Sequence, residues 1–267
     1  MDLTTVSSLR PARRREDLSL APGEALLAGG TWLFSEPQPA VTGLVDLTAL
    51  GWPAWEERSE GGLRIAATCT VEQVGTAPWG AAAGLVRQCA DAFLMSFKVQ
   101  HTATVGGNLC LGLPAGAMIS LLSALDGIVV VWTPDGGERR LPVVDFVTGA
   151  GTTDLRPGEV LRAVDLPAIS SAVGDLSTFA FRKMALTPLG RSAAVVIGRR
   201  VGETLTLTVT AATERPVVLS FDSTATADQL RRALAGIDCW FDDPHGAPDW
   251  RRAMTLRLAE QVREELA

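Results

Sequence analysis

Two short segments, far apart in the chain, have residue types that can bind phosphate oxygens through the backbone. The first is Leu27-Ala28-Gly29-Gly30-Thr31-Trp32 and the second is Thr104-Val105-Gly106-Gly107-Asn108. In each, apolar residues lead into a Gly-Gly pair followed by a small polar residue. Glycine adopts positive φ angles and allows close backbone approach, and successive N–H groups in such a turn can form a concave nest for an anion. Two such nests could together clasp a diphosphate.

Either glycine pair alone is also explained by a tight turn at the end of a strand, because a Gly-Gly pair is a weak motif. Neither pair lies in a G-x-x-x-x-G-K-[ST] sequence, which excludes a P-loop motif. Neither lies in a G-x-G-x-x-G sequence that opens a helix, so a Rossmann dinucleotide site is not supported. The diphosphate hypothesis therefore requires the two segments to come together in the fold.

Short apolar strands and helices are expected around both segments. Residues 25–28 are predicted to be a strand that runs into the first glycine pair, and the second pair is placed at the end of another short strand. Residues 79–95 have the apolar spacing of a helix, and 96–102 form a polar approach to the second pair. Pro114 suits the first turn of the next helix and Gly127 suits its end. Further strands are predicted at 44–47, 63–68, 128–132, 139–143 and 159–166.

After residue 177 the chain is dominated by β-branched and apolar runs that predict a second sheet. Strands are expected at 178–184, 193–201, 204–211 and 217–221, and amphipathic helices at 227–234 and 249–266. Arg251 and Arg252 are interpreted as members of an exposed helix face. A stretch of small residues at 170–175 is the expected boundary between a domain of residues 1–170 and a domain of residues 171–267.

Composition and charge exclude several classes of protein. Of the 267 residues, 47% are hydrophobic and 20% are charged, which is typical of a globular protein. The net charge of -6 gives no support for a nucleic-acid surface, and no apolar run reaches membrane-spanning length. The arginine-rich start leads into an apolar stretch broken by Pro22, so a secretory signal is not indicated. We therefore expect a cytoplasmic protein.

Residues that bind metals are too few and too scattered for a redox metal centre. The chain has two histidines and no C-x-x-C pair. The cysteine spacing suits neither zinc nor an iron–sulfur cluster, so free buried thiols are expected at Cys69, Cys89, Cys110 and Cys239. The sequence predicts no metal site and nominates no acid–base catalyst.

Together with their surroundings, the two segments resemble the FAD-binding (medium) subunit of the molybdenum hydroxylases, the family of xanthine dehydrogenase and carbon monoxide dehydrogenase. The stretch Ala103-Thr104-Val105-Gly106-Gly107-Asn108-Leu109 is similar to the most specific motif of that family. Leu44-Val45-Asp46-Leu47 follows the first segment at a suitable distance, as it does in the family. The resemblance runs from about Leu26 to Pro167 and is thin from Phe181 onward.

The resemblance implies an α+β protein with the vanillyl-alcohol-oxidase-type FAD-binding fold in two α/β parts. A small C-terminal domain with an antiparallel sheet and helices would follow. FAD would be the cofactor, with the backbone of both segments around its pyrophosphate and ribityl chain. Side chains of Thr31, Thr104 and Asn108 would add hydrogen bonds. The implied cofactor-binding residues are Leu27, Ala28, Gly29, Gly30, Thr31, Trp32, Thr104, Val105, Gly106, Gly107, Asn108, Leu161 and Arg182.

The resemblance also implies a function. Electrons from a molybdenum centre would arrive through iron–sulfur clusters and leave through FAD to an acceptor such as NAD, a quinone or oxygen. Four cysteines are too few for two clusters, so an iron–sulfur subunit and a molybdopterin subunit are implied as partners in a hetero-oligomer. Two alternatives stay open: a stand-alone flavoprotein oxidoreductase of the same fold, and a degenerate, non-catalytic scaffold subunit.

Several departures from the family pattern bear on the flavin end of the site. Ala117 stands where the family has an aspartate that contacts the ribityl hydroxyls. Arg182 takes the place of a lysine near the cofactor, and the twin-arginine stretch beyond it is replaced by residues 186–192; a solvated role for Arg182 stays open. The chain has no tyrosine, so Trp32 or another apolar side chain would cover the flavin ring. A core role stays open for both Trp32 and Leu161.

Overall fold

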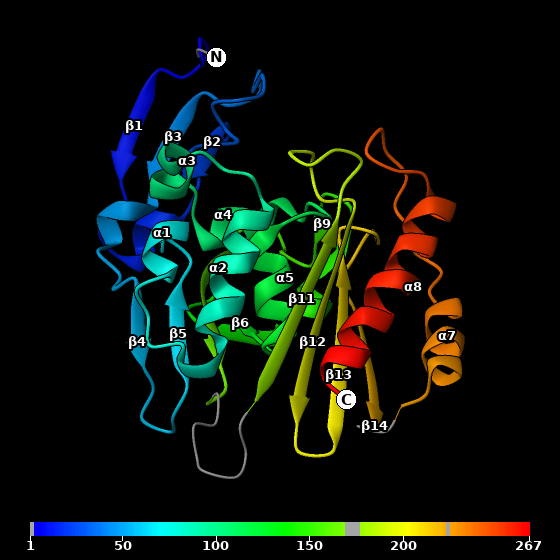
Figure 1. Cartoon of the computed structure of the whole chain (residues 1–267). Helices are drawn as coiled ribbons and strands as arrows, with labels where there is room; N and C mark the ends of the chain where they lie inside the picture. The colour runs from blue at the N-terminus through cyan, green and yellow to red at the C-terminus, as the bar shows by residue number, and fades with distance from the viewer. Residues whose placement is uncertain (1–2, 169–176, 223–224) are drawn as a thin grey trace.

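The structure is a computed structural model that describes residues 3–168, 177–222 and 225–267. The predicted domain boundary at residues 170–175 lies outside the described residues. Within them, a small N-terminal sheet is followed by a five-stranded sheet with helices and then by a four-stranded sheet with two further helices (Figure 1). This is the α+β fold expected from the sequence, with the antiparallel sheet at the C-terminal end.

The N-terminal sheet carries the first glycine segment. It is parallel, in the order β1-β3-β2, and consists of β1 (Ser8–Pro11), β2 (Glu24–Leu27) and β3 (Gly43–Asp46). Arg10 on β1 and Glu24 on β2 form an ion pair with an Nε–Oε1 distance of 2.7 Å. Hydrogen bonding by this guanidinium lowers the pKa of Glu24 to about 2. This ion pair therefore connects the two outer strands across β3, and β2 leads directly into the first glycine segment. Two 3-10 turns flank the sheet, η1 (Arg15–Leu18) and η2 (Leu47–Leu50).

The second sheet is antiparallel and has the order β4-β5-β10-β6-β7. The two strands predicted at 128–132 and 139–143 are confirmed, and residues 134–137 join them as the turn between β6 and β7. The strands are β4 (Trp55–Glu57), β5 (Leu63–Ala66), β6 (Ile128–Trp132), β7 (Glu138–Pro142) and β10 (Val160–Leu166). A short hairpin, β8 (Val147–Gly149) with β9 (Thr152–Thr153), follows β7.

Short helices pack between and beside the sheets. They are α1 (Val71–Val74), η3 (Gly80–Ala82), α2 (Ala83–Ala92), α3 (Phe97–Thr102), α4 (Val105–Leu111), α5 (Ala117–Ala124) and α6 (Val143–Phe146). Of these, α4 and α6 contact the five-stranded sheet directly. All eight residues of α5 are buried, because α5 contacts α2 and α4 on one side and the C-terminal sheet on the other (Figure 1). One core therefore runs from the five-stranded sheet through these helices to the C-terminal sheet.

The C-terminal sheet is antiparallel in the order β11-β12-β13-β14, and its other face is covered by helix α8. Its elements are β11 (Thr178–Met184), β12 (Ala194–Val201), β13 (Thr204–Thr210), β14 (Val217–Asp222), α7 (Ala227–Ala235) and α8 (Pro248–Glu265). The N–H of Ala211 donates to the carbonyl of Pro114 at 2.8 Å. The segment just before α5 is therefore tied to this sheet.

The structure corrects several local predictions. Residues 97–102 form helix α3 instead of a polar approach, and the second glycine pair lies inside helix α4 instead of at a strand end. Strand β1 was not predicted because its four residues show little apolar pattern. Arg251 is 1% exposed, so its placement on an exposed helix face was wrong. Cys69 and Cys89 are buried as expected, whereas Cys110 is exposed and Cys239 is half-buried.

Candidate cofactor-binding site

The first glycine segment leaves β2 and turns sharply. Gly30 has a φ of 68°, and a Cβ atom there would lie 2.6 Å from the ring of Phe34. This position therefore requires glycine. No backbone N–H of residues 29–33 has a hydrogen-bond partner within the described part of the chain. Five successive unpaired N–H groups can donate hydrogen bonds to the oxygens of an anionic ligand.

The second glycine segment forms the first turn of α4. Thr104 is the N-cap, and its hydroxyl oxygen accepts a hydrogen bond from the N–H of Gly107 at 3.1 Å. The N–H groups of Val105 and Gly106 donate to the carbonyls of Cys69 and Ala67, both at 2.8 Å. These N–H groups are therefore used within the fold, and the predicted nest is not formed here. What this segment can offer a ligand is the Thr104 hydroxyl proton, the Asn108 amide and the bare Cα of Gly107.

The two segments meet through close backbone packing. A Cβ atom on Gly29 would lie 1.8 Å from the carbonyl oxygen of Thr102, at the end of α3 and just before the Thr104 cap. A Cβ atom on Gly106 would lie 2.7 Å from Ala67. By contrast, a Cβ atom on Gly107 meets only the Thr104 hydroxyl, at 3.1 Å. Gly29 therefore allows the two segments to come together, Gly106 allows α4 to pack against Ala67, and Gly107 leaves open space beside α4.

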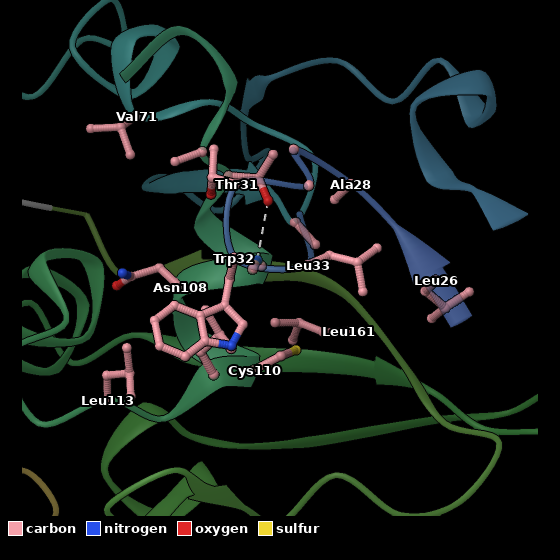
Figure 2. Close-up of a pocket in the computed structure, with 18 of the residues that line it drawn as sticks. Leu26, Ala28, Thr31, Trp32, Leu33, Val71, Asn108, Cys110, Leu113 and Leu161 are labelled. Atoms are coloured by element: carbon pink, nitrogen blue, oxygen red, sulfur yellow. Dashed lines mark hydrogen bonds between the residues drawn. The ribbon is translucent and has the colours of Figure 1, made fainter. Parts of the chain in front are cut away.

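This space belongs to a cavity of about 920 Å³. Figure 2 shows Thr31 and Trp32 of the first segment beside the same space as Asn108 and Cys110 of α4 and Leu161 of β10. The predicted site residues that line the cavity are Leu27, Ala28, Gly29, Gly30, Thr31, Trp32, Thr104, Gly106, Gly107, Asn108 and Leu161.

Two predicted site residues are not in the lining. Val105 is 0% exposed and packs in the core. Arg182 donates to the carbonyl of Phe181 at 2.9 Å and pairs with Glu265 of α8 at 2.5 Å. A solvated, ion-paired role for Arg182 therefore describes its position better than a place beside the cavity.

Asn108 has a structural task besides its place in the lining. Its Oδ1 accepts hydrogen bonds from the N–H groups of Met118 at 2.9 Å and Ile119 at 3.3 Å. It thereby caps the start of α5, which has no cap from its own N-cap residue Gly116. The Asn108 amide nitrogen remains as a donor. Ala117, in the position of the missing aspartate, is 4% exposed in the core.

Some lining residues were missed from the sequence. They are mostly apolar side chains from the segment after α2, from α3 and α4, and from the segments after α4 and β9, together with two residues from the loop between β11 and β12: Phe93, Met95, Val99, Cys110, Leu113, Leu155, Arg191 and Ser192. Cys110 lies four residues after Gly106 and three after Gly107, so a helix predicted at 105–111 would have placed it on the same face as these glycines. Surrounding protein atoms desolvate the Cys110 sulfur, and this desolvation raises the pKa of the thiol to about 12. The thiol is therefore neutral at pH 7.

The lining is almost free of charge. In the described residues, only Glu159 and Arg191 carry a full charge there. Glu159 pairs with Arg139 at 2.7 Å, and hydrogen bonding by that guanidinium lowers the pKa of the carboxyl. Apolar walls and unpaired backbone donors suit flat, weakly polar rings joined by an anionic linker. The cavity and its lining therefore suit a large cofactor whose rings are joined by a diphosphate.

The comparisons with known proteins identify the family. Residues 6–169 match the family described as the FAD binding domain in molybdopterin dehydrogenase, and the chain belongs to this family. FAD is therefore its cofactor, and the chain is an FAD-binding component of an oxidoreductase, as the resemblance implied.

Relatives are similar over different shares of the chain. Caffeine dehydrogenase subunit beta of Pseudomonas is 34% identical over 29% of this chain and 26% of that subunit. The aldehyde oxidoreductase FAD-binding subunit PaoB of Escherichia coli is 25% identical over 64% of this chain and 72% of that subunit. The chain thus covers only about a quarter of the first of these relatives.

Solved structures share the fold over the whole chain. Quinoline 2-oxidoreductase of Pseudomonas putida superposes with a TM-score of 0.78 at 22% identity, over 100% of this chain and 99% of that chain. A carbon monoxide dehydrogenase of Hydrogenophaga pseudoflava gives 0.80 at 20% identity, over 97% of this chain and 96% of that chain. At these identities the likeness shows the fold alone, and it confirms the predicted fold class.

Two further properties concern the described residues only. None of their helices has the length and apolar character needed to cross a bilayer. They contain no group of three or more His, Cys, Asp or Glu side chains arranged to hold a metal ion.

Proposed function

We propose that this chain carries electrons between partner subunits and an external acceptor through FAD held in the cavity. The observation that supports this most is the meeting of the two glycine segments over a cavity whose nearest backbone donors, at residues 29–33, are unpaired. The donors would be iron–sulfur clusters of one partner subunit, fed by a molybdopterin subunit. The acceptor would be NAD, a quinone or oxygen.

The bound FAD would supply the redox chemistry, and the residues of this chain would bind it and exclude water. N–H groups of residues 29–33 would bind the diphosphate, assisted by the Thr104 hydroxyl and the Asn108 amide. Gly107 would leave room for the diphosphate, and Leu161 would pack on an apolar ring. In this proposal residues 1–170 form the FAD-binding domain, and residues 171–267 a C-terminal domain that adds the loop with Arg191 and Ser192.

Exposed apolar side chains lie in the segments that line the cavity and provide a place for a partner. Trp32 is 41% exposed, Phe97 of α3 is 75% exposed, and Leu189 of the β11–β12 loop is 85% exposed. Large exposed apolar side chains of this kind are typical of protein interfaces. We propose that the electron-donating subunit docks on them, because this brings its clusters near the cavity.

Co-purification tests this proposal. When the chain is expressed together with the proposed iron–sulfur and molybdopterin subunits, it is expected to elute as a yellow-brown complex that releases FAD on denaturation. Leu189→Asp is expected to lower the recovery of the iron–sulfur partner by about tenfold, since a buried interface charge costs more than the 1.4 kcal/mol that corresponds to a factor of ten. FAD content of the isolated chain should not change.

Val218→Asp is the matched control, because Val218 is also an exposed apolar residue but lies on β14, outside the cavity lining. A colourless chain that takes up no added FAD would contradict the proposal and favour the scaffold alternative. A yellow chain that never retains a partner would favour the stand-alone flavoprotein.

A further inference from the structure

Arg191 is a cation at the cavity without an anionic partner. Among the described residues, its guanidinium has neither an ion pair nor a hydrogen bond. The other charge in the lining, on Glu159, is 7% exposed and is neutralised by Arg139. The cavity therefore has one uncompensated positive charge, contributed by the C-terminal half of the chain.

The backbone on both sides of Arg191 is fixed. The Ser192 hydroxyl donates to the carbonyl of Ala92 at 3.0 Å, at the end of α2. The carbonyl of Ala193 accepts a hydrogen bond from Arg251 of α8 at 2.6 Å, and the N–H of Ala193 donates to Met184 at 2.8 Å. These hydrogen bonds hold the backbone next to Arg191 beside the end of α2. The cavity-lining residues Phe93 and Met95 follow directly after α2.

A different group of residues lines another part of the cavity. Leu26, Leu47 and Val160 pack in one apolar cluster of the N-terminal sheet and β10, and all three are in the lining. This part suits a ring that is neutral in every redox state, such as adenine. The diphosphate has the unpaired N–H groups of residues 29–33 as donors. The adenine needs no charged partner and the diphosphate already has donors. The Arg191 guanidinium is therefore available to the flavin ring, the part of the cofactor whose charge changes on reduction.

We infer that Arg191 faces the redox-active ring of FAD and stabilises the reduced flavin. This inference rests on the proposed cofactor site. Two-electron reduction with uptake of one proton leaves a negative charge spread over N1 and the C2 carbonyl of the flavin ring. A cation nearby attracts that charge and has no such effect on the neutral oxidised ring. Arg191 is then a positioning and tuning residue that selects between redox states.

The expected effect is on relative affinity. Arg191→Gln should weaken binding of reduced FAD about tenfold more than binding of oxidised FAD, since Arg191 is exposed and its attraction is partly screened. By thermodynamic linkage, a tenfold change in that ratio lowers a two-electron midpoint potential by about 30 mV. Arg191→Lys keeps the charge and should restore most of the potential.

The test uses the full chain reconstituted with FAD. The dissociation constant of oxidised FAD is measured by fluorescence titration, and the midpoint potential by equilibration with reference dyes. Arg182→Gln is the matched control, because Arg182 lies on β11, the strand that precedes the loop with Arg191, and is outside the cavity lining. We expect a lower potential for Arg191→Gln only, with oxidised FAD bound within about threefold of wild type.

Two results would overturn the inference. An unchanged potential in Arg191→Gln would show that the guanidinium does not sense the ring. An equal loss of affinity for oxidised and reduced FAD would place the charge on the diphosphate instead. If the wild-type chain binds no FAD, the cofactor site itself is refuted, and this outcome is distinct from both.

Discussion

Replacing Gly107 by valine is expected to lower the affinity for FAD about 100-fold while the fold remains intact. In α4 the Cβ position of residue 107 is restricted only by the Thr104 hydroxyl at 3.1 Å, and the space beyond belongs to the cavity. The two methyl groups of valine would occupy the volume between the two glycine segments in which the diphosphate is proposed to lie. A factor of 100 corresponds to about 2.7 kcal/mol, which is typical of steric exclusion from a bound site.

The neighbouring glycines cannot serve for this test, because a Cβ atom on Gly29 or Gly106 would collide with the backbone of the protein itself. Gly84→Val is the matched control, since Gly84 also lies in a helix and its Cβ position meets no atom within 4 Å. Titration with FAD and thermal unfolding of both apo-variants separate binding from folding. Full FAD occupancy in Gly107→Val would show that the diphosphate does not lie beside α4.

The largest expected loss of stability comes from Arg251→Met. Arg251 is 1% exposed, and its guanidinium donates to the carbonyls of Gly246 at 2.7 Å and of Ala193 and Ala211 at 2.6 Å. It also pairs with Asp243. Methionine fills a similar volume but leaves three carbonyls without their guanidinium donor. It also removes the cation beside Asp243, whose Oδ1 still accepts a hydrogen bond from the N–H of His245. Removing one partner from a buried ion pair costs about 3–5 kcal/mol.

Arg252→Met is the matched control, because Arg252 is the next residue of α8 and is exposed. Urea unfolding at pH 7 should show the loss for Arg251→Met and a change within about 0.5 kcal/mol for Arg252→Met. We also expect weaker FAD retention in Arg251→Met, since Ala193 adjoins the cavity-lining loop. Equal stability of the two variants would mean that the buried hydrogen bonds contribute little.

Local signals were sufficient for much of the fold. The Pro-Asp-Gly-Gly turn of residues 134–137 after the apolar run of residues 128–132 specified the β6–β7 hairpin, and Pro114 with Gly127 bracketed α5. A continuous apolar run located β12, and an alternating pattern located β13, each within one residue. The two glycine segments were found because glycine pairs, flanked by apolar residues and small polar ones, form a pattern that depends only on the local sequence.

Helix α4 could not be predicted from propensity, because glycine in a helix costs about 1 kcal/mol relative to alanine and here two occur in succession. Tertiary contacts outweigh this cost. Thr104 caps the first turn, and the absence of a side chain on Gly106 lets α4 pack against Ala67. The same contacts use the N–H groups that the nest hypothesis assigned to phosphate. In the proposed diphosphate site, the second glycine segment would therefore contribute open space more than backbone donors.

The charges at the site were the least predictable feature. Arg251 shares one helix face with the buried residues Thr255, Leu258 and Val262, and this helical spacing could have revealed its burial. Arg191 carries no such signal, because it reaches the cavity only when the β11–β12 loop is tied to α2 and α8. Arg182 was nominated instead, because it stands where the family has a lysine near the cofactor. In the structure its side chain pairs with Glu265.

Amide hydrogen exchange with and without FAD tests the central claim most directly. The unpaired N–H groups of residues 29–33 should exchange rapidly in the apo-chain and become protected when a saturating amount of FAD is added. Residues 204–210 in β13 should show no change, because they are already paired in the C-terminal sheet. Stoichiometric binding of FAD with unchanged exchange at residues 29–33 would contradict the diphosphate clamp.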